Sequence, residues 1–202
     1  MKTYPTITKD IQNDIHIYAF DKLDGNNIRA EWNSKRGFYK FGSRNQLIDE
    51  NSKPLGNSIP IIREKYEEDL AMIFKENKWR DVICFFEYHG PNSFAGRHIE
   101  DETQTVTLFD VNPYKRGMME PREFIRTFQH LDIPNVLFEG RVNSIFVDKV
   151  KNSTLKGMTF EGVVCKGVNK NQVVRFKIKS KAWLEKLKLY CNGDMKLFEK
   201  LS

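Results

Sequence analysis

The sequence has little of several features that would assign it to particular protein classes. It holds only three cysteines among 202 residues, and their spacing is not that of a zinc site. The four histidines are scattered, so a metal site of histidine and cysteine is not expected. No apolar run approaches the roughly 20 residues of a membrane span, and the first residues lack the apolar core of a signal peptide. These absences favour a cytoplasmic protein with reduced thiols.

The composition is that of an ordinary globular domain, but its charge is unevenly distributed. Apolar residues make up 40% and charged residues 30% of the chain, so we expect a single domain over residues 1–202. The net charge is +6, yet residues 141–202 hold 14 basic and 5 acidic residues. A basic C-terminal third suits a polyanionic partner such as nucleic acid. A solvated, lysine-rich surface would give the same count.

Hydrophobic periodicity predicts an α+β fold, with antiparallel β-sheets and flanking helices. Ser58 is expected to cap a helix that runs through Phe74, and the strand 26–32 is expected to be the hairpin partner of the strand before it. The predicted strands cover residues 14–20, 26–32, 37–42, 82–88, 105–111, 159–166 and 172–179. The other predicted helices cover residues 120–130, 142–150 and 181–200.

Lys22 stands in an unusual setting, between the carboxylates of Asp21 and Asp24 and three residues before Gly25. A lysine can be a covalent nucleophile only if it loses its proton near neutral pH. Because its ordinary pKa is about 10.4, nearby cations or a metal must lower that value. Asp-Gly is also a common turn dipeptide, so this motif alone is compatible with a simple hairpin.

Four more segments follow in a fixed order: Phe85-Phe86-Glu87-Tyr88, Leu108-Phe109-Asp110-Val111, Glu161-Gly162-Val163-Val164 and Phe176-Lys177-Ile178-Lys179. With the Lys22 motif they resemble the covalent nucleotidyltransferases, which are polynucleotide ligases and mRNA capping enzymes. The loop Phe94-Ala95-Gly96 and the stretch 175–186 are most similar to nick-sealing RNA ligases of the phage RNA ligase 2 type. The resemblance spans roughly residues 15–186. It implies an ATP-grasp-like ligase adenylation domain. Too few residues remain after the last motif for a C-terminal OB-fold domain, so none is expected.

The resemblance implies that Lys22 attacks ATP and carries AMP, with Mg²⁺, or Mn²⁺ in its place, as the metal. Lys177 and Lys179 lie two residues apart on a predicted strand, so their side chains share one face. They could neutralise phosphate charge and, by repulsion, help Lys22 lose its proton. A solvent-facing strand would show the same spacing.

Glu87 and Glu161 each follow an apolar strand, where a carboxylate is costly unless a cation accompanies it. Both are expected to bind the metal and the nucleotide, since Mg²⁺ prefers oxygen ligands. Ordinary salt bridges at a sheet edge are the alternative. An isolated buried carboxylate is also dispensable for folding, so replacing Glu161 by alanine is expected to leave the melting temperature unchanged or raised.

Four further residues match nucleotide-binding positions of the resembled family. Phe109 could stack on adenine, although an aromatic in a strand is often simply core. Asp21 stands where nick-sealing ligases have a glutamate that contacts adenine, and its shorter side chain departs from that pattern. Asn27 matches an asparagine near the phosphate. Arg44 fits an arginine that contacts AMP and the 5′-phosphate, or is a surface arginine.

These features together predict an ATP-dependent RNA ligase for RNA repair, joining 5′-phosphate and 3′-hydroxyl ends through lysyl-AMP and an adenylylated 5′ end. The expected partner is RNA, in the form of a nicked duplex, and no membrane. The small size is compatible with a phage or viral origin. The alternatives are a minimal ATP-dependent DNA ligase, a capping guanylyltransferase, and a nucleic-acid-binding module without catalysis.

Overall fold

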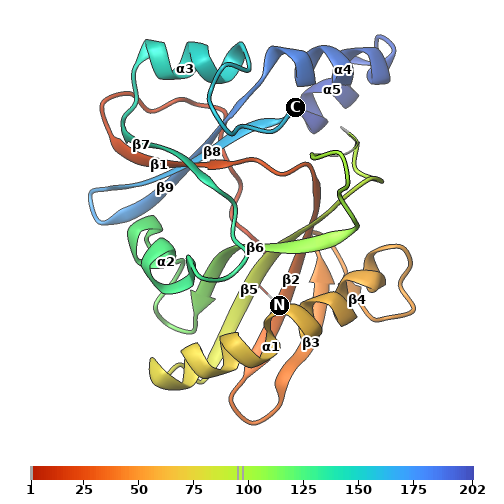
Figure 1. Ribbon diagram of the computed structural model, residues 1–202, viewed down its shortest axis with the longest axis vertical. Coiled ribbons are helices and arrows are strands. Elements are labelled where there is room, and N and C mark those ends of the chain that lie inside the picture. The colour runs from red at the N-terminus through yellow and green to blue at the C-terminus, as the bar shows by residue number, and fades with distance from the viewer. Residues whose placement is uncertain (1, 95, 97) are drawn as a thin grey trace. The chain divides into compact units, whose positions relative to one another are not determined.

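The computed structural model describes residues 2–94, 96 and 98–202, so Ala95 of the Phe94-Ala95-Gly96 loop lies outside the described residues. Within these ranges the chain forms nine strands in two antiparallel sheets and five α-helices (Figure 1). The predicted α+β class is confirmed. The chain divides into two compact units, and it passes from one to the other three times, after Thr6, Leu23 and Pro134. The five-stranded unit holds the residues up to Thr6 and Asp24–Pro134, and the four-stranded unit holds Ile7–Leu23 and Asn135–Ser202.

The five-stranded unit has the strand order β4-β3-β2-β5-β6. Helix α1 packs on this sheet through the apolar stripe that the periodicity predicted; its Tyr66 ring lies 5.2 Å from Phe86, and its Phe74 ring lies 5.1 Å from Trp32. The strands are β2 (Gly25–Asn33), β3 (Gly37–Ser43), β4 (Leu47–Ile48), β5 (Asp81–His89) and β6 (Thr105–Pro113). The helices are the 3-10 turn η1 (Leu55–Asn57), α1 (Ser58–Glu76) and α2 (Pro121–Phe128).

The four-stranded unit has the strand order β7-β1-β8-β9, so β1 lies inside the sheet. Helix α3 buries Phe146 and Val150 in a core shared with Ile17, Val163 and Phe176. The strands are β1 (His16–Asp21), β7 (Val136–Arg141), β8 (Gly162–Asn169) and β9 (Gln172–Lys179). The helices are α3 (Ser144–Lys151), α4 (Lys181–Cys191) and α5 (Met195–Leu201).

Three local expectations were wrong. The strands β1 and β2 are not a hairpin, because β1 pairs with β7 and β8 while β2 pairs with β3 and β5. The predicted helix 181–200 is two helices, separated where Asn192 adopts a left-handed conformation with φ of 44°. Ser58 is the first residue of α1 rather than its N-cap, which is Asn57, and its hydroxyl donates to the carbonyl of Leu55.

Two motif glycines stand where the backbone leaves no room for a side chain. A Cβ on Gly25 would lie 2.4 Å from the carbonyl oxygen of Tyr88, which belongs to the neighbouring strand β5. A Cβ on Gly162 would lie 2.1 Å from the carbonyl oxygen of Ile178, and Gly162 also has a φ of 135°. Contacts under 3.0 Å force the backbone to shift, so both glycines are required for strand pairing beside the motif residues that precede them.

Cys84, Cys165 and Cys191 are buried and free. Among the described residues, we find no helix that combines the length and the apolar character needed to span a bilayer.

Candidate active site

Lys22 directly follows the central strand β1, and two contacts fix its position. Its backbone N–H donates to the carbonyl oxygen of Gly162 at 3.0 Å. Its Nζ donates to Oε2 of Glu161 at 2.8 Å. The backbone bond continues the pairing of β1 with β8. Because Gly162 directly follows Glu161, this pairing places Lys22 close to the Glu161 carboxylate. The ammonium group is held on a side chain that is 20% exposed and therefore reachable from solvent.

Glu161 binds two lysines at once and is almost completely buried, with 4% of its side chain exposed. Its Oε2 contacts Lys22, and its Oε1 lies 2.9 Å from Nζ of Lys179. Burial by itself raises the pKa of this carboxyl, but the two ammonium groups outweigh burial and hold the pKa below its usual value. Glu161 stands directly before β8, not after a strand as predicted, and Glu87 lies within β5.

Lys177 and Lys179 occupy alternate positions of β9, as their spacing predicted. Lys179 is bound by Glu161 and also lies 3.5 Å above the ring centre of Trp183, a cation–π contact that stabilises its charge. Burial, followed by repulsion from Lys179, Lys22 and Lys9, lowers the pKa of Lys177 to about 8. Several positive charges therefore lie around the buried carboxylate of Glu161.

Lys9 belongs to this cluster, although no motif pointed to it. It lies in the segment before β1, and its neighbour Thr8 accepts a hydrogen bond from the backbone N–H of Lys177 at 2.9 Å. That bond brings the N-terminal segment alongside β9. A lone lysine outside any periodic pattern carries no sequence signal, so only the tertiary contact reveals it.

Asp21 is buried and its carboxylate holds the segment before Glu161. Its Oδ1 accepts hydrogen bonds from the backbone N–H of Thr159 at 3.0 Å and from the Thr159 hydroxyl at 3.1 Å. These bonds tie the end of β1 to the approach to β8. The geometry gives Asp21 a positioning role for Glu161, and its predicted contact with adenine stays a prediction.

The remaining predicted residues lie in the five-stranded unit. Asn27 and Glu87 are direct cross-strand partners on β2 and β5, so their side chains share a face. Among the described atoms, the buried Oδ1 of Asn27 has no hydrogen-bond partner. A carboxylate beside an amide oxygen suits a hard cation such as Mg²⁺ or Mn²⁺. Glu87 fits its predicted metal role, which stays a prediction, and Asn27, predicted to lie near the phosphate, could add an oxygen ligand.

Phe109 and Arg44 differ in how firmly the fold holds them. Phe109 is half-buried on β6 and packs edge-on against Tyr4, with ring centres 5.0 Å apart. Stacking on adenine would require one open face of the Phe109 ring, and this contact stays a prediction. Arg44 is exposed in the bend after β3. Both alternatives remain, a contact with AMP and the 5′-phosphate or a simple surface arginine.

The structure also brings together His89, His98 and Glu102, although the histidines are scattered in the sequence. Their potential metal-binding atoms all lie within 4.8 Å of one another. The backbone N–H of Asp24 donates to Nε2 of His98 at 2.9 Å, so the proton of this ring is on Nδ1, 2.8 Å from Glu102. A metal at Nδ1 would have to remove that proton. The bonds therefore favour a hydrogen-bonded network that fastens the Asp24-Gly25 turn.

Comparisons with known proteins identify the family and the fold of this chain. The family model described as RNA ligase matches residues 15–179. A comparison with curated protein sequences gives no match. Solved structures of Naegleria gruberi RNA ligase share the fold. The complex with pyrophosphate has a TM-score of 0.66 at 17% identity, covering 86% of this chain and 52% of that one. A mutant with AMP and Mn has a TM-score of 0.64 at 16% identity, covering 91% and 59%.

A further mutant of the same ligase, with ATP and Mn, has a TM-score of 0.64 at 15% identity and covers 86% of this chain and 52% of that one. This chain thus spans between half and three fifths of the length of these structures. The two sheets and the lysine that follows β1 define the fold class of the nucleotidyltransferases. Within that class, the chain belongs to the RNA ligase family.

The two ion pairs of Glu161 reverse the expectation that this residue is dispensable for folding. Glu161→Ala leaves two ammonium groups close together without their carboxylate, so it should lower the free energy of unfolding by about 3 kcal/mol. Urea denaturation at pH 7 measures this. Glu185→Ala, which removes an exposed glutamate of α4, is the matched control. A Glu161→Ala chain as stable as the control would show that the ion pairs contribute little.

The low pKa of Lys177 predicts a pH-dependent stability. Between pH 8 and 10.5, the unfolded chain holds a proton on this side chain that the folded chain has lost, so the contribution of Lys177 to stability rises with pH across this window. The uncharged variant Lys177→Met lacks this rise. Its stability relative to the unaltered chain should be highest below pH 8 and decline towards pH 10.5. Urea denaturation at several pH values tests this, and parallel curves for both chains would contradict it.

Proposed function

We propose that this chain is the catalytic part of an ATP-dependent RNA ligase that joins 5′-phosphate and 3′-hydroxyl ends. The observation that carries the proposal is the placement of Lys22 against Glu161, with Lys179 on the other carboxylate oxygen and Lys177 beside it on β9. Simple binding of nucleic acid has no need for a nearly buried carboxylate between two lysines. Membership of the RNA ligase family supports the same chemistry.

In the first step, the neutral amine of Lys22 attacks the α-phosphorus of ATP. A P–N bond forms, the bond to the bridging oxygen breaks, and pyrophosphate leaves with that electron pair. The low pKa of Glu161 keeps the resting Lys22 charged, so the nucleophile is stored in an unreactive form. Lys177 and Lys179 act in the opposite sense, because their charge disfavours a third ammonium group and stabilises the leaving phosphates. AMP then passes to a 5′-phosphate, and a 3′-hydroxyl displaces it.

The divalent ion has one well-suited place among the described residues. Glu87 and Asn27 offer oxygen ligands on one sheet face, and Asn27 Oδ1 is otherwise unsatisfied. When bound, Mg²⁺ or Mn²⁺ would neutralise phosphate charge. Glu161 fits a metal role less well, since each of its oxygens already accepts a bond from an ammonium group. We propose that it acts first as the ion-pair partner of Lys22.

The other predicted roles are part of the proposal. Phe109 would stack on adenine, Arg44 would contact AMP and the 5′-phosphate, and Asp21 would act by positioning Glu161 through Thr159. The excess of basic residues in 141–202 supports RNA as the polyanionic partner. The Naegleria gruberi ligase was solved with ATP, AMP and Mn, which supports ATP and a divalent ion here.

Lys22→Ala should abolish covalent labelling by ATP labelled at the α-phosphate, while the chain stays folded. Lys22→Arg should fail too, because a guanidinium does not provide a neutral amine at this pH. The measurement is label that survives a denaturing gel in the presence of Mg²⁺ or Mn²⁺. Lys188→Ala, an exposed lysine of the same unit, should label normally. Label that persists in Lys22→Ala would remove the nucleophile assignment, and labelling by GTP in place of ATP would favour the capping enzyme.

Sealing should depend on ribose at the 3′-hydroxyl side of the nick. We expect recognition of phosphates, 2′-hydroxyls and A-form shape rather than base edges, so binding should be independent of sequence and fall steeply with salt. The test compares matched nicked duplexes that differ only in ribose or deoxyribose at the last nucleotides before the nick. Equal sealing of an all-DNA nick would favour the DNA ligase, and no sealing or labelling of any kind would favour a binding module.

A further inference from the structure

Three turns of the five-stranded unit meet at one end of its sheet. The turn between β2 and β3 is joined to the segment after α1, because the backbone N–H of Ser34 donates to the carbonyl of Arg80 at 2.9 Å. The turn after β6 reaches the same segment, because the backbone N–H of Tyr114 donates to the carbonyl of Asp81 at 2.9 Å. The three turns are neighbouring parts of one surface and cover residues 34–36, 77–80 and 114–117.

These turns carry six basic side chains and no acidic one. All six are exposed, and among the described residues none of them takes part in an ion pair. We call them the distal basic patch: Lys35, Arg36, Lys78, Arg80, Lys115 and Arg116. The carboxylates that border the turns are Glu76 and Asp81, and Asp81 already accepts a hydrogen bond from the side chain of Asn33 at 2.6 Å. The charge of the patch therefore suits a polyanion.

Aromatic rings accompany two of the arginines. The guanidinium carbon of Arg36 lies 3.7 Å above the ring centre of Tyr39, and that of Arg116 lies 5.8 Å from the ring centre of Trp79. Such contacts restrain the planar guanidinium group, whose fork of N–H donors matches a phosphate. Tyr114 adds a ring that is 68% exposed. Basic and aromatic side chains together are typical of surfaces that bind nucleic acid.

Lys78 stands where the end of a helix favours glycine. It directly follows the C-cap Asn77 of α1 and has a φ of 57°. Its backbone N–H donates to the carbonyl of Lys75 at 3.0 Å, and the backbone N–H of Trp79 donates to that of Phe74 at 2.8 Å. These two bonds define a Schellman motif, in which the residue at this position is usually glycine because a side chain disfavours positive φ.

Lys115 shows the same departure in the turn after β6. The backbone N–H of Arg116 closes this turn by donating to the carbonyl of Pro113 at 3.1 Å, and Lys115 is its third residue, with a φ of 65°. Glycine or asparagine usually fills a third turn position with positive φ. Lysine is the less stable choice at both places, and relative to glycine it adds a long side chain with a positive charge. Two such lysines in adjoining turns indicate a use for that charge.

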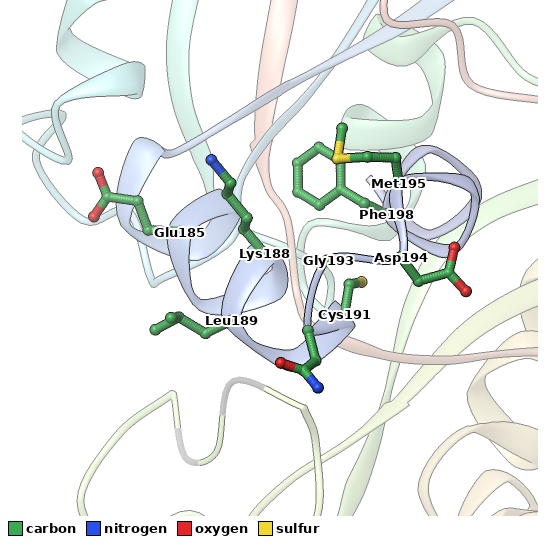
Figure 2. A pocket seen from close by; sticks show the side chains of 9 residues that line it. Glu185, Lys188, Leu189, Cys191, Gly193, Asp194, Met195 and Phe198 are labelled. Atoms are coloured by element: carbon green, nitrogen blue, oxygen red, sulfur yellow. The ribbon is translucent and has the colours of Figure 1, made fainter.

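The C-terminal helices offer a surface of mixed charge for contrast. Figure 2 shows the hollow between α4 and α5, which is lined by the carboxylates of Glu185 and Asp194 as well as by the ammonium group of Lys188. A polyanion would meet repulsion there as well as attraction. The turns of the distal basic patch contain no carboxylate, so the patch is the better surface for a polyanion.

We propose that the distal basic patch binds the phosphate backbone of an RNA duplex at a distance from the reaction. Asn33 pairs with Asp81 beside the patch, six residues along β2 from the pair of Asn27 and Glu87. At about 3.3 Å per residue, the patch lies roughly 20 Å from these proposed metal-binding residues, which is about six base pairs along a duplex. The inference rests on the proposed function for RNA as the partner. It adds a second RNA contact, outside the basic C-terminal third.

The double variant Lys78→Gly with Lys115→Gly separates the charge of the patch from its fold. Because glycine suits both backbone positions, the melting temperature should rise by roughly 2–4 °C per site. Fluorescence anisotropy measures the affinity for a nicked RNA duplex with arms of about twelve base pairs. That affinity should fall about tenfold, and the slope of log affinity against log salt should decrease by about two. Labelling by ATP should be unaltered.

Matched controls distinguish charge from position. Lys78→Arg with Lys115→Arg keeps both charges at the same backbone positions and should bind RNA as the unaltered chain does. Lys53→Ser with Arg63→Ser removes two exposed charges near the other end of α1 and should leave the affinity unaltered. A nicked duplex with arms of about four base pairs, closed by non-nucleotide linkers, does not extend to the patch and should bind equally to every chain.

Unaltered affinity of the double glycine variant for the long duplex would overturn the proposal. An equal loss with the short duplex, or an equal loss in Lys53→Ser with Arg63→Ser, would overturn it too, as would weak binding by the double arginine variant. Absence of AMP labelling in every chain would remove the ligase assignment instead, and the comparison of long and short duplexes would still decide on the patch.

Discussion

The contact on which the site depends is the one between the Glu161 carboxylate and two ammonium groups. A carboxylate with 4% of its side chain exposed is tolerable only because Lys22 and Lys179 each bind one of its oxygens. The two lysines would repel each other without it. In the reaction proposed above, Lys22 would have to lose a proton before it attacks ATP. The Glu161 carboxylate opposes that loss, and the positive charges of Lys177 and Lys179 favour it.

Backbone pairing, rather than side-chain packing, brings these three residues together. Lys22 continues β1, Glu161 precedes β8, and Lys179 ends β9, and the register pairs Gly162 with Lys179. Gly162 permits this pairing because a side chain there would collide with the carbonyl of Ile178. Asp21 adds a second restraint through Thr159. Each motif thus combines a residue with a proposed chemical role and a glycine that strand pairing requires. This explains why Gly25 follows Lys22 and Gly162 follows Glu161 in the sequence.

The sequence predicted the elements and the chemistry better than it predicted their connections. The predicted strands correspond to seven of the nine observed ones. The motif order singled out Lys22, Glu161 and Lys179, which the structure joins in ion pairs, and Lys177 on the same strand as Lys179. The sequence did not reveal that β1 and β2 belong to different sheets, because the local alternation of apolar residues does not identify the strand with which a given strand pairs. Strands β4 and β7 were missed, since β4 has only two residues and β7 has no buried residue that would give a clear alternation. Lys9 and the histidines joined by Glu102 became visible only when the fold placed distant segments side by side.

The order of segments in the two units has a consequence for synthesis of the chain. The five-stranded unit is largely continuous, from Asp24 to Pro134, and can fold while later residues are still being made. The four-stranded unit joins residues near the N-terminus to Asn135–Ser202, so β1 waits for both of its neighbours. Its long-range pairing is of the slow kind. On the ribosome, a nascent chain carries Lys22 early but acquires Glu161 and Lys179 only near residue 179, so an unfinished chain lacks the two ion pairs of the site.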